Sequence, residues 1–146
     1  MAVVVFVLDR LTKNAVAANL RVGESREVLD DYIRITHSQN TGAAFGLLPE
    51  RTTLLSVLSV LAVLVILYYY RQLRADSPLI ATTLGLQLGG AFGNLVDRLG
   101  QGYVVDFIDV GIGPYRYWTF NVADSSIVVG IFGVLGLLWL EERRKT

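Results

Sequence analysis

Three long stretches of the sequence are free of charged residues, and they limit the possible folds more than any other feature. Residues 54–70 and 127–140 carry no charge, and residues 79–96 carry none either, with Gln87 and Asn94 as their only amide side chains. A helix needs about 20 mainly apolar residues to cross a bilayer, and each stretch approaches that length once its flanks are counted. The sequence therefore predicts a single-domain, α-helical integral membrane protein.

A further membrane helix is expected at the N-terminus, although it contains charges. Only seven apolar residues, 2–8, precede Asp9, Arg10 and Lys13. Such charges are costly inside hydrocarbon unless they are paired or face a polar interior. Asp9 and Lys13 are four residues apart, so they can meet on one helix face as a structural ion pair. We expect four membrane helices in all, at approximately 1–19, 53–71, 78–98 and 123–141.

Basic residues indicate how these helices are oriented. They occur in the short link between the second and third helices and in the C-terminal tail, at Arg71, Arg74, Arg143, Arg144 and Lys145. Positive charge in short loops marks the cytoplasmic side, so both termini are expected in the cytoplasm. The polar segments 21–51 and 100–121 then face the other side. Within the first of them, residues 27–40 alternate enough to predict one or two short surface strands.

Glycines at helical spacing predict where the helices pack against each other. They are Gly85, Gly89, Gly90 and Gly93 in the third helix, and Gly130, Gly133 and Gly136 in the fourth. In lipid, small residues at this spacing allow two helix backbones to approach closely. We favour this structural role over phosphate binding, because no strand precedes these glycines.

The composition excludes several kinds of chemistry. The formal net charge is zero and no basic patch suggests nucleic acid as a partner. The chain has no cysteine, which rules out a disulfide framework and a thiol nucleophile. Its single histidine, His37, cannot form a multi-histidine zinc site. We therefore expect no metal and no cofactor, and we interpret His37 as a surface or hydrogen-bonded residue.

Polar residues gather where the third helix ends. Asn94 and Asp97 are three apart and so point to one side of that helix. Arg98 is a fixed cation with five donors, suited to holding carbonyl or carboxylate groups. Asp97 has two open interpretations, a site residue or one half of a helix-end salt bridge with Arg98.

Asp106 and Asp124 are the strongest candidates for chemistry, and Asp109 is a weaker one. Asn121 is placed to cap the fourth helix, with Asp124 three residues later, so a purely structural capping role for Asp124 remains open. The glycine-rich segment between Asp106 and Asp124 can fold the two carboxylates together. Two carboxylates in one site do not both ionise easily, which favours an acid–base pair. We expect Asp124 to be the base, because the helix N-terminus favours its charged form, and Asp106 the initial acid. Asp109 is interpreted as a surface or loop acid.

Five motifs in order carry a resemblance to a known family. They are Asp9 with Lys13, NTGAAF at 40–45, GGAFGNLVDR at 89–98, VVDF at 104–107 and FNVADS at 120–125. Together with the membrane helices, they make the chain resemble the bacterial lipoprotein signal peptidases (signal peptidase II). The likeness covers almost the whole chain. Two departures are Arg10, where the family usually has Gln, and Trp118-Thr119, where it often has a proline.

The resemblance implies an aspartyl endopeptidase of the bacterial inner membrane, active as a monomer near the outer face. Such enzymes remove the signal peptide from prolipoproteins, before a cysteine that already carries diacylglycerol. The implied partners are lipid-modified prolipoproteins and membrane lipids. Asp106 and Asp124 take the catalytic positions. Residues implied in substrate binding are Asn40, Asn94, Arg98 and Asn121. Supporting residues are Asp9, Lys13, Gly42, Ala44, Asp97 and Ala123. The resemblance also implies a periplasmic surface sheet and a mobile loop before Asn121 that covers the site.

Three other hypotheses stay open. A small ion- or proton-coupled transporter would place carboxylates in the middle of its helices. A non-catalytic membrane scaffold would use only the glycine faces. A Ser–Lys hydrolase would combine Ser125 or Ser126 with Lys13.

Overall fold

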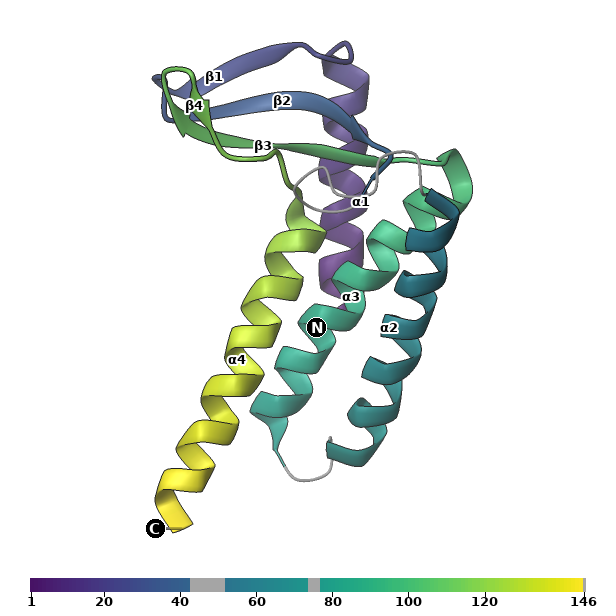
Figure 1. The fold of residues 1–146 in the computed structure, drawn as a ribbon, viewed down its shortest axis with the longest axis vertical. Helices are drawn as coiled ribbons and strands as arrows, with labels where there is room; N and C mark the ends of the chain where they lie inside the picture. The colour runs from purple at the N-terminus through teal and green to yellow at the C-terminus, as the bar shows by residue number, and fades with distance from the viewer. Residues whose placement is uncertain (43–51, 74–76, 146) are drawn as a thin grey trace.

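The computed structural model of the protein describes residues 1–42, 52–73 and 77–145. A small sheet lies across one end of a group of helices, and its hairpin end projects beyond the top of α4 (Figure 1). In chain order the elements are α1 (Ala2–Asn19), β1 (Ser25–Leu29), β2 (Ile33–Asn40), α2 (Thr52–Leu73), α3 (Pro78–Gln101), β3 (Val104–Ile112), β4 (Tyr115–Arg116) and α4 (Val122–Lys145).

Helix α3 is the centre of the helical part, because α1, α2 and α4 all pack against it. Its glycines allow this. A Cβ atom on Gly89 would lie 2.5 Å from the carbonyl oxygen of Ala2 in α1, and one on Gly90 would lie 2.4 Å from that of Ala123 in α4. The predicted role of these glycines in helix contacts is confirmed. The same prediction is wrong for Gly136, whose Cβ position has no described atom within 4 Å.

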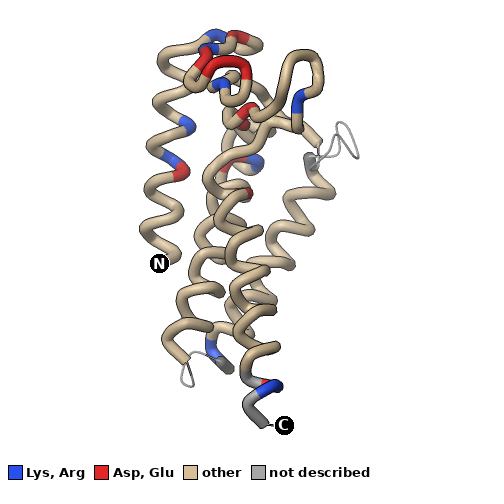
Figure 2. Tube along the Cα trace, turned by 90° about the vertical axis from the view of Figure 1, so that its left-hand side faces the viewer, with Lys and Arg blue, Asp and Glu red and all other residues tan. Residues whose placement is uncertain are grey.

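Three of the described helices are long and apolar enough to cross a membrane, over Thr53–Gln72, Pro78–Gln101 and Val122–Leu140. Figure 2 shows most charged positions at the sheet end of the molecule or at the opposite end of the helices. This distribution fits a membrane-embedded protein. Helix α1 is not among the three, since it carries charges at Asp9, Arg10 and Lys13. The expectation of a fourth membrane helix stays a prediction.

The sheet has the strand order β1-β2-β3-β4, and all neighbouring strands are antiparallel. One or two short strands are expected within residues 27–40, and two are present: β1, which begins at Ser25, and β2. Residues 104–112, expected to lead into a mobile loop, instead form the longest strand. Four consecutive residues of β3, Val104 to Phe107, are buried, because both faces of the strand are covered. In a strand that is buried on both faces, polar and apolar residues do not alternate. The pattern by which a half-buried strand is predicted is therefore missing from β3.

The end of α1 holds the sheet in place. Val16 and Leu20 of α1 form a buried cluster with Val105 and Phe107 of β3. Successive side chains of a strand point to opposite faces. Asp106 therefore points away from this cluster, toward the first turn of α4.

Candidate active site

Asp106 lies on β3 and is almost fully buried, with 2% of its surface exposed. Two amide side chains hold its carboxylate. Asn121 Nδ2 donates to Asp106 Oδ1 at 2.7 Å, and Asn40 Nδ2 donates to Asp106 Oδ2 at 2.8 Å. Asn40 is itself oriented by the backbone N–H of Gly42, which donates to Asn40 Oδ1 at 2.9 Å. Strand β2 and the start of α4 thus fix the position of this carboxylate.

Asp124 is the third residue of α4 and forms a capping box with Asn121. The Asp124 N–H donates to Asn121 Oδ1 at 2.9 Å, and the Asn121 N–H donates to Asp124 Oδ2 at 3.2 Å. The capping role expected from the sequence is therefore confirmed. It does not use the whole carboxylate, because Asp124 Oδ1 accepts a 2.8 Å hydrogen bond from Asn94 Nδ2 of α3.

Asn121 joins the two aspartates. Its side-chain oxygen caps the helix at Asp124, while its side-chain nitrogen donates to Asp106. The same nitrogen lies 3.3 Å from Asn94 Oδ1. Asp106 and Asp124 line one cavity of about 790 Å³, together with residues that include Asn40, Asn94, Arg98, Tyr117, Trp118, Phe120, Ile127, Val128 and Val129. The structure thus brings the two aspartates together with all four residues expected to bind substrate, which are Asn40, Asn94, Arg98 and Asn121.

The pKa of Asp106 is raised to about 7, first by burial of the carboxyl group and second by the negative charge of Asp124. The hydrogen bonds from Asn40 and Asn121 act oppositely, since they stabilise the carboxylate form. A carboxyl group with this pKa can hold a proton near neutral pH while remaining in contact with a second carboxylate.

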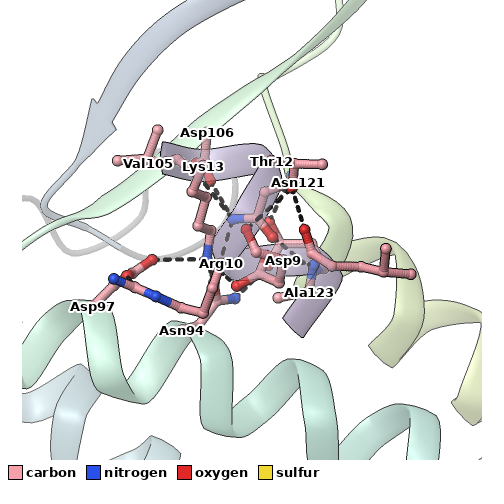
Figure 3. Close-up of polar contacts among 12 residues, drawn as sticks. Asp9, Arg10, Thr12, Lys13, Asn94, Asp97, Val105, Asp106, Asn121 and Ala123 are labelled. Atoms are coloured by element: carbon pink, nitrogen blue, oxygen red, sulfur yellow. Dashed lines mark hydrogen bonds and ion pairs between the residues drawn. The ribbon is translucent and has the colours of Figure 1, made fainter. Parts of the chain in front are cut away.

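A buried network of charges lies behind the cavity (Figure 3). Lys13 Nζ is 2.7 Å from Asp9 Oδ2, 2.7 Å from Asp97 Oδ2 and 2.9 Å from Asn94 Oδ1. The predicted Asp9–Lys13 pair is confirmed. Asp9 Oδ1 also accepts a 3.0 Å hydrogen bond from the N–H of Ala123, which ties α1 to the start of α4.

Asp97 belongs to this network. The interpretation of Asp97 as one half of a helix-end salt bridge with Arg98 is therefore wrong. Its carboxylate pairs with Lys13 and Arg10, whereas Arg98 lies on the cavity side, with Nη1 3.5 Å from Ser59 Oγ. The sequence alone could not reveal this choice, because Lys13 is 84 positions away in the chain. Sequence reasoning named Arg10 as a charge in the first helix and as a departure from the family pattern, but it missed that Arg10 pairs with Asp97.

The structure corrects the interpretation of Asp109 and decides between the two interpretations of His37. Asp109 is not a surface acid: it is buried, and its Oδ1 accepts a 2.9 Å bond from Arg116 Nε across the β3–β4 hairpin. Thr36 Oγ1 donates to its other oxygen at 3.0 Å. His37 is hydrogen-bonded rather than superficial, with Nδ1 2.8 Å from the carbonyl oxygen of Leu20. Ala44 lies outside the described residues.

The geometry does not favour the other chemistries. The hydroxyls of Ser125 and Ser126 donate to carbonyl oxygens of Asn121 and Ala123, and no described hydrogen bond joins either serine to Lys13. Within the part of the chain that the structure describes, no group of three His, Asp or Glu side chains could hold a metal ion. Asp106 and Asp124 lie on a strand and in a first helical turn, not in the middle of membrane helices as a transporter would require.

Comparisons with known proteins agree with this geometry. Residues 1–140 match the family model described as "Signal peptidase (SPase) II". The chain is 44% identical to a lipoprotein signal peptidase of Moorella thermoacetica, over 95% of this chain and 88% of that one. It is 37% identical to one of Bacillus subtilis, with coverages of 99% and 94%. A solved structure described as a bacterial membrane enzyme superimposes with a TM-score of 0.90 at 32% identity, covering 99% of this chain and 88% of the other.

Proposed function

Because the chain belongs to the signal peptidase II family, we propose that it removes the signal peptide from diacylglyceryl-modified prolipoproteins, cutting before the lipidated cysteine. It is a protease, as its relatives are named. The observation that carries the finer proposal is the junction at Asn121, which places the carboxylates of Asp106 and Asp124 in one cavity.

The two carboxylates divide the work of hydrolysis. Asp124, ionised, takes a proton from a water molecule as the water oxygen attacks the scissile carbonyl carbon. Asp106, which holds a proton near neutral pH because of its raised pKa, gives that proton to the carbonyl oxygen. The tetrahedral intermediate then collapses: the C–N bond breaks, the leaving nitrogen receives the proton held by Asp124, and Asp106 recovers its own. Protons and bonds balance without a metal or a cofactor.

The surrounding polar residues have separate roles. Asn40 and Arg98 line the cavity and are proposed to hold the substrate backbone, with Asn94 and Asn121 orienting the dyad beside them. Asp9, Lys13 and Asp97 support Asn94 and the start of α4 from behind. Gly42 and Ala123 support the site through their backbone N–H groups. Ala44 is proposed as a further supporting residue, on the resemblance alone.

The cavity suits a substrate that carries lipid. One wall consists of Ile127, Val128 and Val129 of α4, and the last two are more than half exposed on the apolar surface of that helix. A diacylglyceryl-modified cysteine can therefore approach from the side, within the bilayer, and place its peptide bond at the two aspartates.

We place all four helices in the inner membrane, with both termini in the cytoplasm and the dyad near the outer face. For α1, the support is that Asp9 and Lys13 are buried while outward residues such as Val3, Val7 and Leu11 are apolar and exposed. Burying paired charges against α3 removes them from the lipid. The enzyme is proposed to act as a monomer.

The test is cleavage of a purified diacylglyceryl-modified prolipoprotein by the full chain in lipid vesicles, followed as a gel shift. Asp106→Asn and Asp124→Asn should each lower the rate at least about 100-fold, since acid–base groups contribute factors of that size. Asp30→Asn is the matched control, because this exposed aspartate lies in the β1–β2 turn at φ 42°, which asparagine tolerates. The unmodified precursor should not be cut. Near-normal turnover by either dyad variant would remove that residue from the mechanism. Inactivity of Ser125→Ala or Lys13→Ala alone would favour a Ser–Lys hydrolase.

A further inference from the structure

Arg98 is held by α2, a helix that carries neither of the two aspartates. It lies in the last turn of α3 and lines the cavity. Its Nη1 atom is 3.5 Å from Ser59 Oγ of α2, and this is its one hydrogen bond within the part of the chain that the structure describes. Helix α2 contacts α3 but not α4 (Figure 1). Ser59 and Asp124 therefore approach Arg98 from two different helices.

The strongest attraction on Arg98 comes from the two aspartates. The carboxylate of Asp124 attracts its positive charge most, and that of Asp106 follows. Arginine commonly binds a carboxylate through two parallel hydrogen bonds. Nevertheless, within the described residues, Arg98 forms no ion pair with either aspartate. The guanidinium lies in the field of the dyad without being bonded to it.

The Ser59 hydroxyl is oriented to accept a hydrogen bond from Arg98. It donates its own proton to the carbonyl oxygen of Leu55, at 2.8 Å and one turn earlier in α2. A hydroxyl group has one proton and two lone pairs, so the lone pairs of Ser59 remain for Arg98. Leu55 is buried, and residues four apart share a helix face. The inner face of α2 thus presents an acceptor to the guanidinium.

A weak contact is enough to decide where Arg98 lies. The 3.5 Å separation is near the upper limit for a hydrogen bond, so Ser59 holds the guanidinium loosely. The opposing pull is also reduced, because both oxygens of each aspartate already accept a hydrogen bond from an amide group. A single hydroxyl can therefore shift the balance between the two positions of Arg98.

We propose that Ser59 is a positioning residue, which keeps Arg98 off the two aspartates until a substrate carbonyl oxygen replaces Ser59 as its acceptor. The inference rests on the proposed peptidase function. If Arg98 were paired with Asp124, it would use the lone pairs that take the proton of the attacking water. It would also be unable to hold the substrate backbone. Ser59 thus keeps the base and the cation available for separate tasks.

Without the Ser59 hydroxyl, Arg98 should turn toward Asp124. Burial, and after it the charge of Asp124, raises the pKa of Asp106, so a cation paired with Asp124 should lower that pKa again. The other charge that acts on Asp106 is Lys13 of α1, which remains bound to its own carboxylates. Asp106 would then lose its proton at a lower pH than in the wild-type protein.

The pH dependence of prolipoprotein cleavage tests this consequence, with the full chain in lipid vesicles. In Ser59→Ala the alkaline limb of the profile should move to lower pH by roughly one unit, the lower end of the effect of a nearby cation. The rate on that limb then falls roughly tenfold. Ser59→Thr keeps a hydroxyl and should restore the wild-type profile. Thr82→Ala is the matched control, because it removes an exposed hydroxyl that bonds to the carbonyl oxygen of Pro78, at the other end of α3.

The Arg98→Gln background shows whether Ser59 acts through the cation. In that background, Ser59→Ala should change the pH profile no further, because no guanidinium is left to move. Alanine favours a helix more than serine does, so the fold should be retained, and circular dichroism checks it. The proposal would be overturned by an unmoved limb in Ser59→Ala, including one accompanied by a higher KM. An equal shift in the Arg98→Gln background would overturn it as well.

A titration without substrate separates this inference from the peptidase proposal. The infrared absorption of the protonated Asp106 carboxyl, identified by its loss in Asp106→Asn, is followed against pH in the same vesicles. Its midpoint should lie at about 7 in the wild-type protein and roughly one unit lower in Ser59→Ala. A shifted midpoint in a protein that cannot cut the lipidated precursor removes the peptidase proposal alone. Normal cleavage with an unmoved midpoint removes the role of Ser59 alone.

Discussion

Lys13 Nζ lies 2.9 Å from Asn94 Oδ1, which leaves the amide nitrogen of Asn94 facing Asp124, 2.8 Å from its Oδ1 atom. A lysine in α1 therefore sets which end of the Asn94 amide points at the proposed base. The two residues are 81 positions apart in the sequence, and the relationship links the fold of α1 directly to the state of the dyad.

Lys13→Met should destabilise the protein strongly. It removes the partner of two buried carboxylates, Asp9 and Asp97, and breaking a buried ion pair in this way costs about 3–5 kcal/mol. Thermal unfolding followed by circular dichroism measures the loss. Arg10→Gln is the control, because Arg10 is partly exposed and Asp97 keeps Lys13; its cost should be at most about 1 kcal/mol. Equal losses in the two variants would show that Lys13 has no special place in the network.

The activity should fall on the alkaline side as Asp106 loses its proton. With its pKa raised to about 7, the acid form is depleted above neutral pH. Removing Asn40 takes away a hydrogen bond that lowers this pKa, so the alkaline limb of the pH–rate profile should move to higher pH in Asn40→Ala. A limb that moves to lower pH, or not at all, would mean that a group other than Asp106 sets it.

The same group should make stability depend on pH. The pKa of Asp106 is 3.8 ordinarily and about 7 in the folded protein, so between these values the folded state binds more protons than the unfolded state. Its stabilising contribution is complete below pH 3.8 and is lost as the pH rises through about 7. Unfolding in detergent across this range should show decreasing stability, and Asp106→Asn should flatten the trend. An unchanged slope in that variant would contradict the assignment.

Gly90→Ala should disturb the site through helix contact. A Cβ atom there would lie 2.4 Å from the Ala123 carbonyl oxygen and 2.5 Å from Ser126 Oγ, so α4 must move near Asp124. We expect a loss of about 1–3 kcal/mol in stability, the usual cost of overfilling a close contact, together with reduced cleavage. Gly136→Ala introduces the same methyl group into open space and should retain both. Matching losses in the two variants would refute the contact argument.

The sequence predicted the helices well because long apolar runs have few alternatives in a membrane protein. It also predicted that Asp106 and Asp124 come together in one place, which the structure shows; their catalytic role stays a prediction. It missed β3, because burial on both faces removes the alternation that marks most strands. It misjudged Asp109, whose partner Arg116 becomes a neighbour only when the hairpin forms. Asp97 was left open for a similar reason: the choice between Lys13 and Arg98 is made by helix contact.

The capping of α4 limits which groups can stabilise the negative charge that would form on the peptide oxygen in the proposed reaction. Three N–H groups at this helix start are already bonded within the protein: Asn121 to Asp124, Ala123 to Asp9, and Asp124 to Asn121. A helix start of this kind often serves as an oxyanion hole, but here those donors are occupied. In the proposed reaction, the charge that develops on the peptide oxygen is therefore met by the proton of Asp106 and by Arg98, a cation that lines the cavity.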